Sequence, residues 1–268
     1  MNYAFIGLGN MAGAILRGMK LSGGFAADGL YGYDADPRQI DRMKKATGLI
    51  PASSVREAAQ QADVLVLAVK PQIMPDVLRA LQGSLGNQLI ITIAAGLPLR
   101  YYEEMLGENT PIVRVMPSLN ARALAASSAI CANARVTPAQ LDTAKKLFSA
   151  VGAVHEVPEK LFSAFSAIAG AAPAFAFQMA DALASAGVKA GLTRPLAQQV
   201  ASEMLLGSGK LLVESGEHPR QLMDQVCSPG GTTIEGVHAL DRWQFDHALH
   251  EAVQAVIDKD QKLGGGKA

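Results

Sequence analysis

Hydrophobic and polar positions follow two different patterns along this chain. Up to about residue 150, short apolar runs are separated by stretches in which apolar residues recur at helical spacing. Five runs predict strands: Tyr3–Leu8, Leu30–Asp34, Asp63–Lys70, Gln88–Ala95 and Pro111–Pro117. Asp63–Lys70 and Gln88–Ala95 are almost entirely apolar, which is typical of strands buried on both faces of a parallel sheet. Strand–helix alternation predicts right-handed crossovers and a sheet covered by helices on both sides.

The pattern changes after a last strand-like run at Gly152–Val157. From about Pro158 to Lys262 one helical stretch follows another, with breaks near Gly187–Leu192, near Gly216–His218 and within Cys227–Leu240. The predicted fold is an α/β N-terminal domain of Rossmann type with a mostly parallel sheet, residues 1–157, followed by an all-α C-terminal domain, residues 158–268. The Ala- and Gly-rich helices of the second domain can pack closely against each other or against a second copy of the chain.

The first predicted strand leads directly into a glycine-rich turn, GLGNMAG. Gly7, Gly9 and Ala12 match the pattern G-x-G-x-x-A, and a helical pattern follows. In dinucleotide-binding folds the first glycine allows a tight turn, the second lets the backbone approach a pyrophosphate, and the third small residue keeps helix and strand close. The helix start at Asn10 and Met11 then offers free amides to the phosphates. This context predicts a bound dinucleotide.

The residues after the next strands leave the choice of dinucleotide open. Asp34 ends the second strand, where a carboxylate binds the ribose hydroxyls of NAD and repels the 2′-phosphate of NADP. Arg38 follows closely and can pair with that phosphate. The ends of two further strands are expected to border the nicotinamide: Ala68, Val69 and Lys70, and Ala94 and Ala95. Lys70 is either a catalytic group or, as is commoner at such positions, a solvated strand end.

Composition narrows the class of protein. Lys+Arg and Asp+Glu both number 24, and hydrophobic residues make up 49% of the chain against 18% charged residues, so neither nucleic acid nor an anionic membrane is an expected partner. The two cysteines lack metal-ligand spacing, and the start of the chain lacks a signal-peptide pattern, so we expect a reduced, cytoplasmic enzyme without a metal. The uncharged stretch Leu161–Ala180 is mostly Ala, Gly and Ser, which favours a packed helix of a soluble protein.

The helical half holds a second candidate anion site. Its histidines are more typical of solvated or packed residues than of a metal ligand or a base, and neither a Ser–His–Asp nor a paired-carboxylate arrangement stands out. In CSPGGTTIEGVHAL, Gly230 and Gly231 are expected to leave amides exposed where Thr232 or Thr233 opens a helix. Such a turn can hold a small carboxylate without a basic side chain. A threonine hydroxyl there can hydrogen-bond a nitrogen that gains a proton.

With these residues in place, the chain resembles the pyrroline-5-carboxylate reductases over nearly its whole length. The segments that carry the resemblance are FIGLGNMAGAILRG (Phe5–Gly18), DVLVLAVKP (Asp63–Pro71), SGEHPRQLMDQV (Ser215–Val226) and VCSPGGTTIEGVHALD (Val226–Asp241). The resemblance implies reduction of 1-pyrroline-5-carboxylate to L-proline, with NADPH as the usual cofactor and NADH used by some members. It also implies a helical domain that interlocks two chains, a homodimer that can assemble further, and a site shared between the two chains.

The resemblance assigns roles to individual residues. The hydroxyl near the imine nitrogen falls on Thr233, and the amides that take the substrate carboxylate fall on the loop from Ser228 through Gly230 and Gly231 to Thr232. The acidic residue near the substrate falls on Glu217. Two segments depart from the family pattern, Met116–Ala121 and Ala167–Phe175, where side-chain hydrogen bonds of relatives are replaced.

Two other functions fit part of the pattern. A dehydrogenase of small hydroxy acids has the same two-domain plan, but it needs a base, and the centre of the predicted helix from Lys160 to Gly187 lacks an ionisable group around Gly170–Gln178. A non-catalytic dinucleotide sensor needs Gly7 and Gly9 but has no need of Thr233. Consumption of NADPH with pyrroline-5-carboxylate separates the three.

Overall fold

The computed structural model describes residues 1–23, 25 and 29–265 of the 268-residue chain. The described residues form two compact units. The first lies within Met1–Gly170 and Val256–Ala268, and the second is Ala171–Ala255. The domain boundary between residues 157 and 158 stays a prediction from the sequence.

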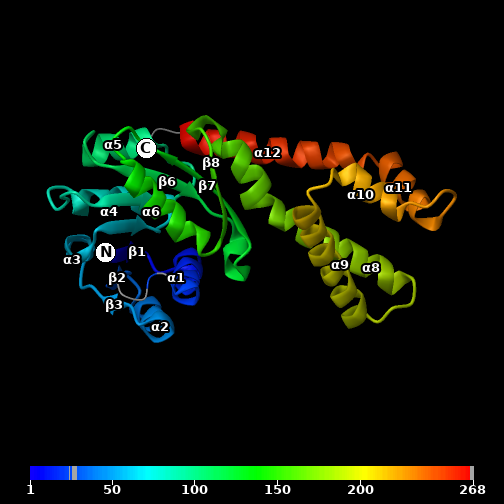
Figure 1. Cartoon of the computed structure of the whole chain (residues 1–268), viewed down its shortest axis with the longest axis horizontal. Helices are drawn as coiled ribbons and strands as arrows, with labels where there is room; N and C mark the ends of the chain where they lie inside the picture. The colour runs from blue at the N-terminus through cyan, green and yellow to red at the C-terminus, as the bar shows by residue number, and fades with distance from the viewer. Residues whose placement is uncertain (24, 26–28, 266–268) are drawn as a thin grey trace. The chain divides into compact units, whose positions relative to one another are not determined.

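An eight-stranded sheet organises the first unit (Figure 1). Its strand order is β3-β2-β1-β4-β5-β6-β7-β8. The strands are β1 Tyr3–Ile6, β2 Leu30–Tyr33, β3 Ile50–Pro51, β4 Val64–Leu67, β5 Leu89–Thr92, β6 Ile112–Met116, β7 Ala126–Ala132 and β8 Gly152–Glu156. Strands β1 to β6 are parallel, and β7 runs antiparallel to β6. The order of the first six strands is that of a Rossmann fold, which confirms the predicted fold class.

Two strands were not among those that the apolar runs predicted. β3 is a two-residue edge strand, and β7 has the sequence ASSAICA. Small and hydroxyl-bearing residues dominate β7, so it lacks the branched aliphatic run that marked its neighbours. β7 nevertheless pairs on both sides, with β6 and with β8.

Helices cover both faces of the sheet. Those of the first unit are α1 Asn10–Ser22, α2 Pro37–Thr47, α3 Val55–Gln61, α4 Met74–Leu81, α5 Leu99–Leu106, α6 Pro138–Ser149 and α7 Phe162–Phe165, with short 3₁₀-helices at Pro71–Ile73, Leu119–Ala123 and Glu159–Leu161. Local capping explains several of their starts. Asp36 caps α2, with Pro37 at its first position, and Thr137 and Gln140 form a capping box at α6.

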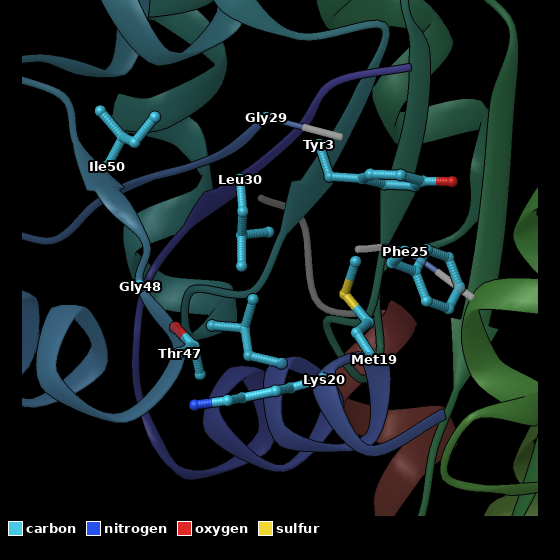
Figure 2. A pocket seen from close by; sticks show the side chains of 10 residues that line it. Tyr3, Met19, Lys20, Phe25, Gly29, Leu30, Thr47, Gly48 and Ile50 are labelled. Carbon is cyan, nitrogen blue, oxygen red and sulfur yellow. The ribbon is translucent and has the colours of Figure 1, made fainter. Parts of the chain in front are cut away.

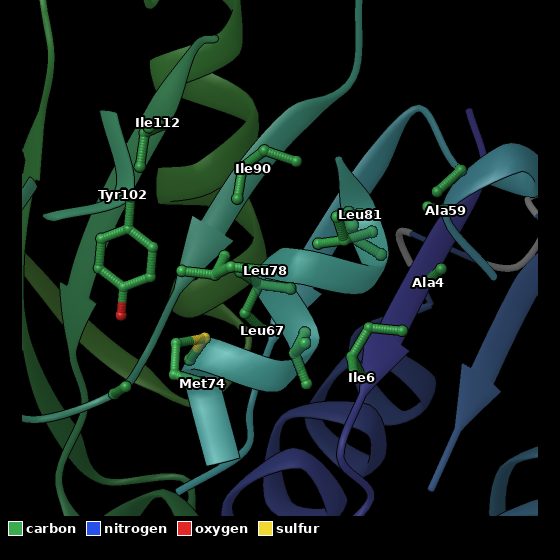
Figure 3. Packing of buried hydrophobic residues seen from close by; sticks show 14 of the residues in the cluster. Ala4, Ile6, Ala59, Leu67, Met74, Leu78, Leu81, Ile90, Tyr102 and Ile112 are labelled. Carbon is green, nitrogen blue, oxygen red and sulfur yellow. The ribbon is translucent and has the colours of Figure 1, made fainter. Parts of the chain in front are cut away.

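Two apolar cores lie on the two faces of the sheet. Alternate residues of a strand enter different cores: Ile6 joins one, Phe5 the other. The first core brings in residues of α3, α4 and α5; Figure 3 shows Leu78 and Leu81 of α4 among its strand residues. Helices α1, α2 and α6 contribute to the second core. Because both faces are covered, every residue of β1, β4 and β5 is buried, which accounts for the uninterrupted apolar runs.

A buried ion pair anchors the chain where it leaves the sheet. Arg114 of β6 is 8% exposed, and its Nη1 lies 2.8 Å from Oε1 of Glu159. The same oxygen accepts a 2.7 Å hydrogen bond from the amide of Leu99, and the Arg114 guanidinium lies over the ring of Phe162. These contacts compensate for the burial of the arginine and fix the start of the helical segment.

The remaining helices follow that segment. They are a π-helix at Ser166–Ala171, α8 Ala172–Lys189, α9 Arg194–Ser215, α10 Pro219–Val226, α11 Thr232–Arg242 and α12 Phe245–Gly265. α8 and α9 pack through small side chains, Ala184 against Ala197 and Ala201. Among the described residues, one continuous helical segment, Glu159–Lys189, is long and apolar enough to cross a membrane by length and composition alone.

Candidate active site

The glycine-rich turn between β1 and α1 is shaped by a backbone that only glycine fits well. Gly7 has a φ of +91°, and a Cβ there would lie 2.8 Å from the carbonyl oxygen of Ala68. Its amide donates a 2.8 Å hydrogen bond to the carbonyl of Tyr33. The turn is therefore held against the ends of β2 and β4, and a side chain at Gly7 would force them apart.

The start of α1 is open toward a ligand. Gly9 is the N-cap in an extended conformation, and it makes no side-chain capping bond. A Cβ on Gly9 would find no heavy atom within 4 Å, so the space beside the turn is free. The first amides of a helix have no partner within it, which leaves those of Asn10 and Met11 available to an anion. These features fit the pyrophosphate of a dinucleotide.

Asp34 braces this turn. Its Oδ2 accepts a 2.7 Å hydrogen bond from the amide of Leu8, and its Oδ1 accepts a 2.8 Å bond from the amide of Asp36. Arg38, the other predicted determinant of cofactor choice, pairs with the Asp36 carboxylate: Nε lies 3.0 Å from Oδ1 and Nη2 lies 3.0 Å from Oδ2. These hydrogen bonds from Arg38 hold the pKa of the Asp36 carboxyl below its usual range.

The other predicted cofactor residues follow β4 and β5. Ala68 and Val69 are half-buried, and Lys70 is exposed. Ala94 is buried and Ala95 exposed. Because β1, β2, β4 and β5 are parallel neighbours, the residues after them lie at one edge of the sheet. The structure thus brings together the predicted cofactor residues of the first unit, while a catalytic role for Lys70 stays a prediction.

A pocket of about 250 Å³ lies at the opposite edge of this sheet. Figure 2 shows it between Tyr3, Leu30 and Lys20, with Thr47 and Ile50 also in its lining. Tyr3 and Leu30 are the first residues of β1 and β2, whereas the glycine turn follows the last residue of β1. Ligands of parallel α/β sheets bind at the carboxyl ends of the strands, so this pocket is separate from the candidate cofactor site.

The glycine-rich loop of the second unit begins with a tight turn. The amide of Gly231 donates a 3.0 Å hydrogen bond to the carbonyl of Ser228, and Gly230 has a φ of +68°. With Pro229 as the second residue and a left-handed glycine as the third, this has the features of a type II turn. A Cβ on Gly231 would collide with the Ser228 hydroxyl and lie 3.1 Å from its carbonyl oxygen.

Helix α11 begins directly after this turn. It starts at Thr232 with Gly231 as N-cap, and no side chain caps it. The threonine hydroxyls therefore leave the helix start open. Since the Gly231 amide closes the turn, the amides that remain for an anion are those of Thr232, Thr233 and Ile234. Thr232 and Thr233 are exposed, and Ile234 is half-buried.

Glu217, the predicted acidic residue, lies in the turn before α10. Nε2 of Gln225 donates a 2.7 Å hydrogen bond to its Oε2. Gln225 is two residues before Cys227, so this bond draws the carboxylate toward the end of α10 that leads into the loop at Ser228. Gln225 was missed by the sequence analysis, because an exposed amide on a short helix gives no pattern of its own.

Two further groups of residues bear on the chemistry. Among the described residues, His, Cys, Asp and Glu form no cluster of three or more that could hold a metal ion. Both cysteines are free thiols: Cys131 is buried and Cys227 is half-buried. Burial raises the pKa of the Cys131 thiol to about 12, which keeps it protonated at neutral pH.

Comparisons with known proteins place nearly the whole chain in one family. Residues 159–263 match the family described as pyrroline-5-carboxylate reductase dimerisation, and residues 2–96 match that described as NADP oxidoreductase coenzyme F420-dependent. A pyrroline-5-carboxylate reductase of Synechocystis sp. is 40% identical over 259 residues, covering 97% of both chains. That of Escherichia coli is 36% identical over 260 residues, again covering 97% of both.

Two solved structures give the same result. A pyrroline-5-carboxylate reductase from Coxiella burnetii superposes with a TM-score of 0.92 at 30% identity, covering 98% of both chains. The pyrroline carboxylate reductase of Plasmodium falciparum, solved with NADP bound, has a TM-score of 0.87 at 31% identity and covers 99% of this chain and 98% of its own. The chain belongs to the pyrroline-5-carboxylate reductase family.

Proposed function

We propose that this protein reduces 1-pyrroline-5-carboxylate to L-proline with NADPH as the hydride donor. Curated relatives named for this activity cover nearly the full chain, and a solved relative carries NADP. Use of NADH as an alternative donor is part of the proposal. The observation that supports it is the uncapped start of α11 behind the Ser228–Gly231 turn. We propose that this helix start binds an anion without a basic side chain.

The first unit holds the cofactor. The amides at the start of α1 take the pyrophosphate, and Gly7 and Gly9 keep the turn narrow enough for it. The strand ends at Ala68–Lys70 and Ala94–Ala95 border the nicotinamide. When bound, the reduced nicotinamide supplies a hydride, and this chain's part is to orient it and exclude water.

The loop of the second unit holds the substrate. Its carboxylate accepts hydrogen bonds from the amides of Thr232, Thr233 and Ile234, and the positive end of the α11 dipole adds to the attraction. Ser228, Gly230 and Gly231 shape the turn that presents these amides. Glu217, held by Gln225, lies toward the same loop.

Reduction of the C=N bond adds a hydride to carbon and a proton to nitrogen. The Thr233 hydroxyl donates a hydrogen bond to the nitrogen and passes on a proton that water supplies. A hydroxyl is too weak an acid to supply that proton alone. Its contribution is a hydrogen bond that strengthens as charge develops on the nitrogen.

The organisation of the active protein extends this proposal. Residues 1–157 form the dinucleotide-binding domain, and residues 158–268 form the domain for dimerisation and substrate. The protein is a soluble homodimer, in keeping with its match to a dimerisation family. Assembly of dimers into a larger complex, a cytoplasmic location and independence from membranes and nucleic acid complete the proposal.

The test is the kinetics of Thr233→Ala with Thr233→Ser as matched control. Loss of one transition-state hydrogen bond costs roughly 2–4 kcal/mol, or about 30- to 1,000-fold in kcat. We expect that loss in Thr233→Ala, a much smaller one in Thr233→Ser, and unchanged NADPH affinity in both. Wild-type turnover by Thr233→Ala would remove the proton role from Thr233.

The same assay distinguishes the alternatives. A dinucleotide sensor would bind NADPH without consuming it when pyrroline-5-carboxylate is added. A hydroxy-acid dehydrogenase would oxidise small hydroxy acids with NADP⁺ and leave the imine unreduced. Either result would overturn the proposed reaction while leaving the cofactor site intact.

A further inference from the structure

Two charged side chains beyond the predicted pair of Asp34 and Arg38, an aspartate and an arginine, bear on the adenosine end of the proposed cofactor site. The first is Asp36, which lies between β2 and α2. This position adjoins the glycine turn, because β2 pairs with β1 in parallel (Figure 1). In Rossmann folds the residue at the end of the second strand meets the ribose that distinguishes NAD from NADP. The charged side chains at this position therefore determine how strongly the 2′-phosphate of NADP is attracted or repelled.

Asp34 is committed to the backbone. Each of its carboxylate oxygens accepts an amide hydrogen bond, from Leu8 and from Asp36, at 2.7 and 2.8 Å. Its charge remains, but its orientation is set by the turn that it braces. Asp34 thus acts mainly as a support of the glycine turn. The charged side chains that remain to attract or repel a 2′-phosphate are those at the start of α2, Asp36 and Arg38.

Asp36 occupies the arginine that would meet the phosphate. Its Oδ1 caps α2 by accepting from the Arg38 amide at 3.0 Å, and both of its oxygens pair with the Arg38 guanidinium. The Arg38 side chain is 90% exposed and that of Asp36 is 32% exposed. A bidentate pair of this kind fixes the guanidinium and cancels most of its field at a distance.

A second arginine stands one helical turn further along. Arg42 Nη2 donates a 3.0 Å hydrogen bond to the carbonyl of Leu8, within the glycine turn. Four residues separate it from Arg38, so both lie on one face of α2. Arg42 is held by a backbone carbonyl and Arg38 by the Asp36 carboxylate, so replacing Asp36 would free a cation on this face of α2.

We propose that Asp36 is a specificity-determining residue that lowers the preference for NADPH over NADH by occupying Arg38. This rests on the proposed function, in which both cofactors are substrates. A 2′-phosphate carries about −1.5 to −2 charges, so it competes with the Asp36 carboxylate for Arg38 and is repelled by it. NADH has no 2′-phosphate, so it neither competes for Arg38 nor is repelled by Asp36 in this way.

The test is equilibrium binding of NADP⁺ and NAD⁺, measured by titration calorimetry without the imine substrate. Asp36→Asn removes the charge and Asp36→Ser also frees Arg38, while both residues still cap α2. We expect the ratio of NADP⁺ to NAD⁺ affinity to rise about 3- to 10-fold in both variants, mainly through NADP⁺. The ratio of kcat/KM for NADPH and NADH should follow.

A double-mutant cycle assigns the gain to Arg38. In the Asp36→Ser/Arg38→Gln protein the ratio should return to about the wild-type value. Asp76→Asn is the matched control, because Asp76 pairs with Arg79 on α4 and its loss changes the net charge equally. It should leave the ratio unchanged.

Two outcomes would overturn the inference. A fall in the NADP⁺ to NAD⁺ ratio in Asp36→Ser would mean that Asp36 holds Arg38 ready for the phosphate. An unchanged ratio would mean that the pair has no part in cofactor choice. Because binding is measured without turnover, the affinity ratio can be interpreted even if the protein does not catalyse the proposed reaction.

Discussion

Two helices of this protein begin in the same way and lie in very different surroundings. α1 and α11 both start behind a glycine N-cap in extended conformation, and neither has a side-chain capping bond. Yet α1 buries a full face, including Ile15, Leu16 and Met19, while α11 buries no residue. The same open helix start thus occurs twice, once on a helix that packs against the core and once on a helix whose residues are all exposed or half-buried.

The difference extends to the two units. Among residues 171–255, all of which the structure describes, the buried positions are Ala184, Ala197, Ala201 and Leu222. Large apolar side chains there are exposed instead, among them the stripe Leu196, Val200, Met204 and Leu211 on one face of α9. The unit that carries the proposed cofactor site therefore has apolar cores of its own, whereas the unit that carries the proposed substrate loop leaves large apolar side chains for a second chain to cover.

The strongest way to break this comparison is to charge the α9 stripe. Val200→Glu keeps a good helix former but places a carboxylate in the expected dimer interface, so we predict monomers and loss of most activity with NADP⁺ binding retained. Sedimentation and calorimetry check this. The control is Leu21→Glu on α1, where the side chain is 72% exposed. A fully active Val200→Glu dimer would contradict the account.

The next largest effect is a difference between alanine variants at Gly7 and Gly9, the two glycines of the proposed cofactor turn. Gly7→Ala meets the Ala68 carbonyl and requires a positive φ, so we expect a loss of stability of roughly 1–3 kcal/mol. Gly9→Ala points its methyl into open space, so the melting temperature should hold while NADPH affinity falls at least about tenfold. Equal losses of stability in the two variants would argue against this geometry.

The second anion site allows a similar pair of variants. Gly231→Ala collides with Ser228, so the turn must open, and KM for the imine should rise about tenfold. Gly230→Ala meets no atom within 4 Å and adds only the strain of its positive φ, about 1 kcal/mol. NADPH affinity should be unchanged in both. Weakened NADPH binding would show that the two sites are not separable in this way.

The smallest effect is the response of the first unit to alkali. Burial raises the pKa of Cys131 from 9.0 to about 12 and that of Tyr102 from 10.0 to about 12. Below pH 9 both states keep these protons. Between pH 9 and 12 the unfolded chain loses them first, so the free energy of unfolding should fall as pH rises. Denaturant titrations at a series of pH values should show that the free energy of unfolding falls less steeply with pH in Cys131→Ala than in the wild type.

Sequence patterns predicted the parts of this molecule that repeat a regular period. The apolar runs located β1, β2, β4, β5, β6 and β8, and the glycine spacing located both open helix starts. They missed the two-residue strand β3 and also β7, which pairs on both sides but consists mostly of Ala and Ser and so has no branched aliphatic run.

Long-range and competing hydrogen bonds could not be predicted in the same way. The sequence around Pro229 and Gly230 is typical of a turn, but its glycines predict that the amide of Gly231 stays exposed. In the structure that amide closes the turn, which leaves the open amides at Thr232, Thr233 and Ile234. The residue types also do not indicate that the exposed Arg38 side chain pairs with Asp36. Such choices are set by local geometry, so residue types at a given spacing leave them open.

The most direct test is a crystal structure of the dimer with NADP⁺ and L-proline. We predict the proline carboxylate within about 3 Å of the amides of Thr232 and Thr233, with its nitrogen at hydrogen-bond distance from the Thr233 hydroxyl. A carboxylate bound instead by an arginine or lysine side chain, away from the start of α11, would contradict the central claim.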